Sequence, residues 1–96
     1  MIKYLEENEN FKDLVKDKKV LVDFYADWCG PCKMMGNVLE EVDFIDIIKV
    51  NVDLFPELSK EYAVMSIPTL IYLENGENKN QSVGFIELDK IREMVE

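Results

Sequence analysis

A pair of cysteines carries the most specific chemical signal in this chain. Cys29 and Cys32 are separated by two residues in the run Trp28-Cys29-Gly30-Pro31-Cys32-Lys33. At the start of a helix this spacing turns both side chains to one side, within the reach of a disulfide bond. The helix N-terminus favours an anion, so Cys29 is expected to be the exposed, attacking thiolate. Cys32 lies one turn deeper, where desolvation is expected to keep it protonated until the second step of a thiol–disulfide exchange.

A CxxC pair can also be half of a metal site. The chain has no histidine, which excludes Cys–His and Ser–His catalysis and the common zinc sites that contain histidine. Two cysteines cannot fill four metal positions within one chain, so we expect no metal and favour pairing of the cysteines with each other. A zinc ion or iron–sulfur cluster bridged between two chains stays open. So does a non-catalytic interaction module in which the sulfurs are incidental.

The elements on either side of the pair are predicted to hold it in place. Residues 20–26 are almost continuously apolar, as expected of a central strand that is covered on both faces. A helix is predicted to open near Pro31, since proline suits the first turn. Apolar residues continue this helix at helical spacing at Met35, Val38, Leu39 and Val42.

The rest of the chain alternates between the two kinds of element before it ends in a hairpin and a helix. An Asn75-Gly76 turn signals the hairpin. We predict strands at 2–5, 45–54, 69–73 and 82–85, and helices around 11–15, 57–62 and 88–95. This order predicts an α/β fold with a central mixed sheet of four to five strands, flanked on both faces by about four helices.

Composition narrows the class of protein. Apolar residues make up 48% of the 96 residues, which suits one compact domain spanning 1–96. The net charge of −9 argues against nucleic acid, whose phosphates require clustered Lys and Arg. No apolar stretch approaches the ~20 residues of a membrane span, and no signal peptide is visible. A cytoplasmic protein is therefore expected, and in that compartment a CxxC is more often catalytic or metal-binding than structural.

The chain resembles the thioredoxin family at residues 20–33 and 67–70. Weaker matches are Lys49 with 51–53, then 75–76 and 83–84, and all of them follow the order in which the family carries them. The resemblance implies a thioredoxin-like fold and a thiol–disulfide oxidoreductase that reduces protein disulfides. It further implies that the protein needs no cofactor besides its own redox-active disulfide. The implied partners are a thioredoxin reductase and disulfide-containing proteins. The resemblance also implies that the chain acts as a monomer. The alternative within the same chemistry is an oxidase or isomerase.

The resemblance also implies roles for two charged residues. Asp23 would be a buried carboxylate that accepts the proton of Cys32, with a pKa raised by burial towards working pH. Lys49 would lie near Asp23 and moderate that shift. The alternatives are a surface aspartate on an edge strand and an ordinary solvated lysine.

A second group of residues is implied to bind the substrate. Pro68 matches the family's cis-proline, which would face the sulfurs and leave the backbone of Ile67 free to pair with an extended substrate. Trp28 would pack over the sulfurs as part of an apolar docking surface, unless it is a core tryptophan. Gly84 would let a partner backbone approach, although a bulge glycine is an alternative. The pair Gly30-Pro31 resembles that of reducing members.

Two positions depart from the family pattern. Gly36 stands within the helix after the cysteines, where many members have a kinking proline. Tyr25 stands where tryptophan is frequent. Neither change alters the sulfur chemistry. An interior glycine costs about 1 kcal/mol relative to alanine, so we expect a helix that is less rigid or is bent for another reason.

Overall fold

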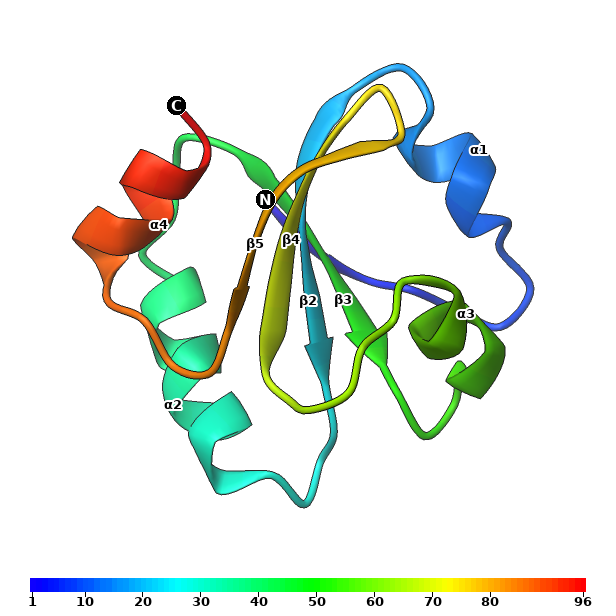
Figure 1. The fold of residues 1–96 in the computed structure, drawn as a ribbon, viewed down its shortest axis with the longest axis horizontal. Helices are drawn as coiled ribbons and strands as arrows, with labels where there is room; N and C mark the ends of the chain where they lie inside the picture. The colour runs from blue at the N-terminus through cyan, green and yellow to red at the C-terminus, as the bar shows by residue number, and fades with distance from the viewer.

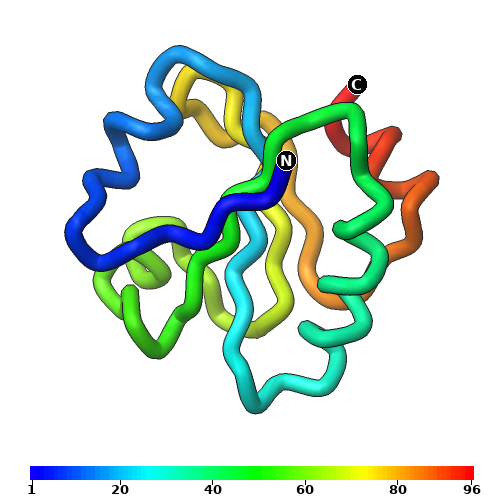
Figure 2. Tube along the Cα trace, turned by 180° about the vertical axis from the view of Figure 1, so that it is seen from behind, coloured from blue at the N-terminus to red at the C-terminus, as the bar shows by residue number.

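A five-stranded mixed sheet forms the centre of the computed structural model, which describes residues 1–96 (Figure 1). The order across the sheet is β1-β3-β2-β4-β5, with β1 and β2 parallel to β3 and the β2–β4 and β4–β5 pairs antiparallel. Seen from behind, the N-terminal strand runs along β3 (Figure 2). The strands are β1 (Ile2–Tyr4), β2 (Lys19–Tyr25), β3 (Asp46–Asn51), β4 (Thr69–Glu74) and β5 (Glu77–Val83).

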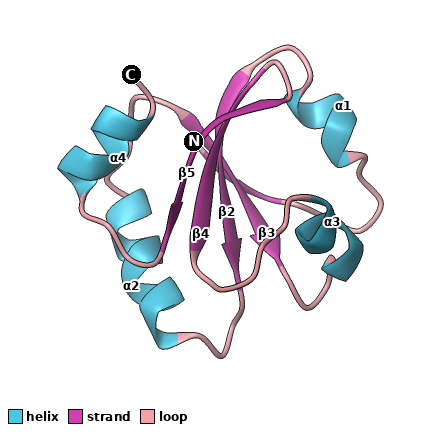
Figure 3. Ribbon diagram, viewed as in Figure 1, coloured by secondary structure: helices cyan, strands magenta, loops and turns pink.

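Helices cover both faces of this sheet, as predicted. Figure 3 shows α1 and α3 on one side and α2 and α4 on the other. None of them is both long enough and apolar enough to span a bilayer. The helices are α1 (Phe11–Val15), α2 (Gly30–Leu39), α3 (Pro56–Glu61) and α4 (Leu88–Met94).

Strand β2 is the middle strand and is buried on both faces. Because successive side chains of a strand point to opposite faces, Val22 and Phe24 join the core beneath α1 and α3, while Leu21 joins the core beneath α2 and α4. Asp23 shares the face of Leu21 and is 0% exposed. The interpretation of Asp23 as a surface residue on an edge strand is therefore wrong.

Helix α2 is shorter than its apolar pattern predicts. It ends at Leu39, whereas the spacing predicted a continuation to Val42. The amides of Glu41 and Val42 donate to the carbonyls of Val38 and Leu39, three residues back, and these tighter turns end the helix. Val42 is still buried against the same core, because the tighter turn keeps it on that side.

The hairpin between β4 and β5 turns at Asn75 and Gly76, as predicted. Both residues have positive φ, 54° and 82°, which is what a two-residue turn of this type requires. The start of β5 was predicted wrongly, because the strand begins at Glu77 instead of residue 82. Its first five residues are polar and exposed on an edge strand, so no apolar alternation signals them. Pairing with β4 alone makes them a strand.

Gly76→Ala tests the conformational requirement of this turn. Its new methyl group would meet no atom closer than 4.0 Å, so the expected loss comes from the left-handed backbone alone. That loss is about 1–2 kcal/mol of unfolding free energy, measured by urea titration of the oxidised protein. Gly30→Ala is the matched control, because Gly30 is helical and open to solvent. Equal stability of the Gly76 variant and the wild type would contradict the assigned turn.

Candidate active site

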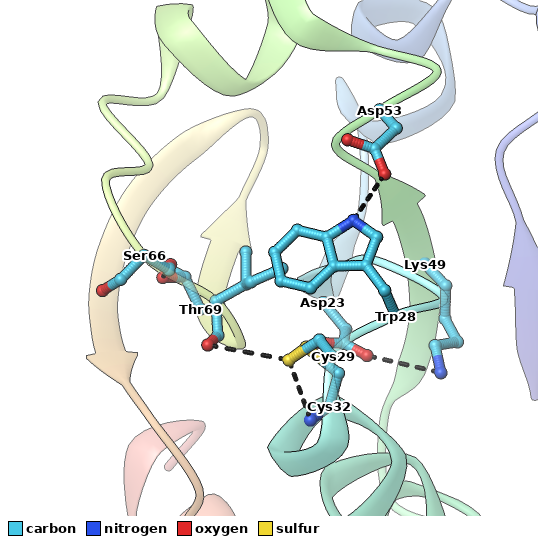
Figure 4. Close-up of a disulfide and its surroundings, with 9 residues drawn as sticks. Asp23, Trp28, Cys29, Cys32, Lys49, Asp53, Ser66 and Thr69 are labelled. Atoms are coloured by element: carbon cyan, nitrogen blue, oxygen red, sulfur yellow. Dashed lines mark hydrogen bonds and ion pairs between the residues drawn. A yellow bond between two sulfur atoms is a disulfide. The ribbon is translucent and has the colours of Figure 1, made fainter.

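The two cysteines form a disulfide where β2 passes into α2 (Figure 4). Cys29 is the N-cap residue of α2, with Pro31 in the first turn of the helix, as predicted. Cys32 follows within that turn, and the two Cα atoms are 5.2 Å apart. The loop that leaves the buried strand therefore delivers both sulfurs to the N-terminus of a helix.

The helix N-terminus directs an amide at the outer sulfur. The N–H of Cys32 donates to Sγ of Cys29 at 3.2 Å. Sγ of Cys29 also lies 3.9 Å from the carbonyl oxygen of Ile67, on the loop before β4. An amide and a helix dipole that point at one sulfur favour negative charge on that sulfur when the pair is reduced.

Exposure does not distinguish the two cysteines, contrary to the sequence-based expectation that Cys29 is exposed. Cys29 is 5% and Cys32 3% exposed. The sulfurs differ in the cleft that each residue lines. Cys29 lines a groove of about 530 Å³ together with Trp28 and Ile67. Cys32 lines a different cleft of about 430 Å³ together with Lys49.

Asp23 is buried beneath α2, on the strand that leads to the cysteines. Burial raises its pKa from 3.8 to about 6, and the nearby Lys49 ammonium opposes that rise. Neither carboxyl oxygen accepts a hydrogen bond from a protein donor. At near-neutral pH this carboxyl therefore exists in both protonation states, which is the property of a group that takes up and returns a proton.

Lys49 reaches Asp23 because of the strand register. The two residues are directly paired on the parallel strands β2 and β3. Nζ of Lys49 lies 3.5 Å from Oδ2 of Asp23, and Lys49 is 9% exposed. The interpretation of Lys49 as an ordinary solvated lysine is therefore wrong.

The loop before β4 borders the groove next to Cys29. The Ile67–Pro68 peptide bond is cis, as the resemblance implied. Neither the N–H nor the C=O of Ile67 has a backbone partner within the chain. Gly84 follows β5, has a φ of 93°, and donates its N–H to the carbonyl of Pro68 at 2.8 Å. The structure thus brings Gly84 to Pro68, and Ile67, the residue before Pro68, lies against Cys29.

Trp28 is on the surface and not in the core. It is 71% exposed, and its indole N–H donates to Oδ2 of Asp53 at 2.9 Å. Asn51 in turn accepts the backbone N–H of Asp53 through its side chain. Sequence reasoning assigned no role to Asp53. Its position just after β3 was the available signal, because the carboxyl ends of the parallel strands β2 and β3 meet at one edge of the sheet.

A buried redox disulfide at a helix N-terminus, next to a cis-proline loop on a mixed sheet, is the arrangement of a thiol–disulfide oxidoreductase. The sequence profile of the thioredoxin family matches residues 2–96. The chain belongs to the thioredoxin family. As the sequence predicted, it is a protein thiol–disulfide oxidoreductase with the CxxC pair Cys29 and Cys32.

Individual relatives agree with this assignment. A thioredoxin of Mycoplasmoides gallisepticum is 45% identical over 85% of this chain and 86% of its own length. A thioredoxin of Bacillus subtilis is 43% identical, over 92% of this chain and 89% of its own. Among solved structures, the thioredoxin of Malassezia sympodialis superposes with a TM-score of 0.86 at 31% identity, covering 98% of this chain and 89% of that one. The thioredoxin-like fold is thereby confirmed, and the oxidase, isomerase and non-catalytic alternatives are not favoured.

The raised pKa of Asp23 predicts a pH-dependent stability. Its folded-state value of about 6 lies above the ordinary 3.8, so the folded protein holds this proton more tightly than the unfolded chain. This contribution is full below about pH 4 and is lost as the pH rises through about 6. It amounts to about 3 kcal/mol, since a tenfold change in proton affinity corresponds to about 1.4 kcal/mol.

Urea unfolding of the oxidised wild type and of Asp23→Asn from pH 4 to pH 8 measures this contribution. The unfolding free energy of the wild type is expected to fall relative to that of the variant by about 2.5 kcal/mol over this range, because a small part of the full contribution is already lost at pH 4. Titrations shared by both proteins cancel in the difference. A difference that stays constant with pH would refute the raised pKa.

Proposed function

We propose that Cys29 is the attacking thiol and Cys32 the resolving thiol of a protein-disulfide reductase. The observation that carries this assignment is the amide of Cys32, which donates to Sγ of Cys29 at the α2 N-terminus. That donor supports a thiolate at Cys29. Cys32 instead lines the cleft that contains Lys49, on the side of the sheet where Asp23 is buried.

The reaction in this proposal has two exchanges. The Cys29 thiolate attacks one sulfur of a substrate disulfide, that disulfide breaks, and the other substrate sulfur leaves as a thiolate. The Asp23 carboxylate then accepts the proton of Cys32, and the Cys32 thiolate attacks Sγ of Cys29. The mixed disulfide breaks, the second substrate thiolate leaves, and Cys29–Cys32 becomes the disulfide. Two electrons pass from the cysteine pair to the substrate.

The groove beside Cys29 is the proposed binding site for the substrate. The unpaired backbone of Ile67 supports pairing with an extended segment, as in an added strand. Trp28 offers an apolar surface at the same groove, where Gly30 and Pro31 also line the wall. In this proposal Pro68 and Gly84 border the bound segment.

Continued turnover requires that the dithiol be regenerated. We propose a thioredoxin reductase as the electron donor and disulfide-containing proteins as the acceptors, with the chain acting as an electron carrier in the cytoplasm. Residues 1–96 would act as one domain and as a monomer. The support for these partners is membership of the family together with the Gly30-Pro31 pair, which resembles that of reducing members.

Cys29→Ser is expected to abolish disulfide reduction, because a serine hydroxyl cannot attack a disulfide at neutral pH. The measurement is insulin reduction with dithiothreitol as the electron source, followed by turbidity. The variant should reduce insulin no faster than dithiothreitol alone. Equal rates for variant and wild type would contradict the role of Cys29.

Cys32→Ser is expected to stop the reaction after its first exchange. The mixed disulfide between Cys29 and the substrate then has no resolving thiol and accumulates. Non-reducing electrophoresis of the variant with an oxidised protein substrate should show this adduct, and dithiothreitol should release it. The double variant Cys29→Ser/Cys32→Ser is the control and should form none. An adduct-free Cys32→Ser sample would argue against Cys32 as the resolving residue.

A further inference from the structure

Two tyrosine rings enclose the ammonium group beside Asp23. Nζ of Lys49 lies 4.7 Å from the ring centre of Tyr25 and 5.5 Å from that of Tyr4. Both distances fall within the roughly 6 Å range of a cation–π contact. The two rings also meet each other edge to face, with centres 6.1 Å apart. Lys49 therefore contacts two aromatic rings as well as a carboxylate.

The strand register explains this grouping. Tyr4 pairs with Lys49 across β1 and β3, and Lys49 pairs with Asp23 across β3 and β2. Tyr25 lies two residues after Asp23 and so shares its face of the sheet. These four side chains therefore lie on one face, at the edge of the sheet from which the active-site loop leaves.

Helix α2 approaches these four side chains at Gly36. A methyl group at this position would lie 3.4 Å from Nζ of Lys49, at the short end of ordinary contact. An alanine methyl group would thus touch the ammonium without a clash, so Gly36 shows how closely α2 approaches Lys49. Gly36, Tyr25, Tyr4 and Lys49 all line the cleft that Cys32 also lines.

The rings matter because the pairing of Lys49 with Asp23 is loose. The separation of 3.5 Å exceeds the 2.7–2.9 Å typical of a charge-assisted hydrogen bond. We propose that Tyr4 and Tyr25 are positioning residues that hold the Lys49 ammonium beside Asp23 and thereby set how readily Asp23 accepts the proton of Cys32. This inference rests on the proposed role of Asp23 as that acceptor.

Other ionisable groups line the same cleft and can influence the titration of Asp23. On β4, the residue opposite Asp23 is the apolar Leu70. Burial and the nearby Asp27 raise the pKa of Tyr25 above 10.0, so its ring is uncharged while Asp23 titrates. Besides Lys49, the titratable or charged side chains that line this cleft are Tyr4, Tyr25, Asp27, Lys33 and Glu40. Cys32 also lines it but is held in the disulfide and does not titrate in the oxidised protein.

The test follows the carboxyl carbon of Asp23 by NMR titration in the oxidised protein. Without the attraction of a ring, the ammonium turns towards the open cleft, and Asp23 loses part of the nearby positive charge. The pKa of Asp23 should then rise by about half a pH unit in Tyr4→Leu and in Tyr25→Leu. This rise corresponds to an approximately threefold increase in proton affinity. Lys49→Met should raise it further, whereas Tyr25→Phe keeps the ring and should leave it unchanged.

A double variant separates positioning from packing. In the Lys49→Met background, Tyr25→Leu should produce no additional shift, because the ammonium through which the ring acts is gone. Unchanged titration in both leucine variants, or a shift that persists without Lys49, would overturn the proposal. Tyr4 is 57% exposed, so Tyr4→Leu supplies the test should Tyr25→Leu fail to fold.

A kinetic measurement distinguishes this inference from the proposed role of Asp23. The protein carrying a mixed disulfide of Cys29 with 2-nitro-5-thiobenzoate releases that coloured thiolate when Cys32 attacks. The pH midpoint of the release rate should move with the Asp23 pKa in Tyr25→Leu. A moved Asp23 pKa with an unmoved rate profile would overturn the role of Asp23 as acceptor and leave the placement of Lys49 by the rings supported.

Discussion

Asp23 and Lys49 occupy matching positions on the adjacent parallel strands β2 and β3, and α2 covers both. A charge in a protein core is costly unless it is well paired, and here the two groups are 3.5 Å apart. The pKa of about 6 at Asp23 reflects this incomplete compensation. The proposed role of Asp23 depends on this value, because a carboxyl with a pKa near the working pH can both take up and return a proton.

The fold gives the two cysteines different surroundings although their exposure is nearly equal. Cys29 meets an amide, the carbonyl of Ile67 and an apolar groove beside Trp28. Cys32 lines the cleft that contains Lys49. In the proposed mechanism the Cys29 side contacts the protein substrate and the Cys32 side takes part in proton transfer. The two surroundings differ because the pair lies at the end of the middle strand β2, with the loop before β4 on one side and β3 on the other.

Local patterns predicted the elements wherever the residues form a continuous apolar run, repeat at helical spacing or include a turn signal. The buried strand β2, the opening of α2 at Pro31 and the Asn75-Gly76 turn were all predicted correctly. The first residues of β5 were missed because an exposed polar edge has no such pattern. The end of α2 was missed because Val42 is buried by a tighter turn that keeps helical spacing in the sequence.

The sequence alone determined the chemistry of this protein. Two cysteines separated by Gly30-Pro31, after an apolar strand and without histidine, leave thiol–disulfide exchange as the favoured reaction. The resemblance implied that Lys49 lies near Asp23, and the structure agrees. Only the tertiary structure revealed the two tyrosine rings around that ammonium and the contact of Asp53 with the indole of Trp28. These contacts join strands and loops far apart in the chain. The register of the strands and the geometry of their crossover connections create these contacts, and the local spacing of residues predicts neither.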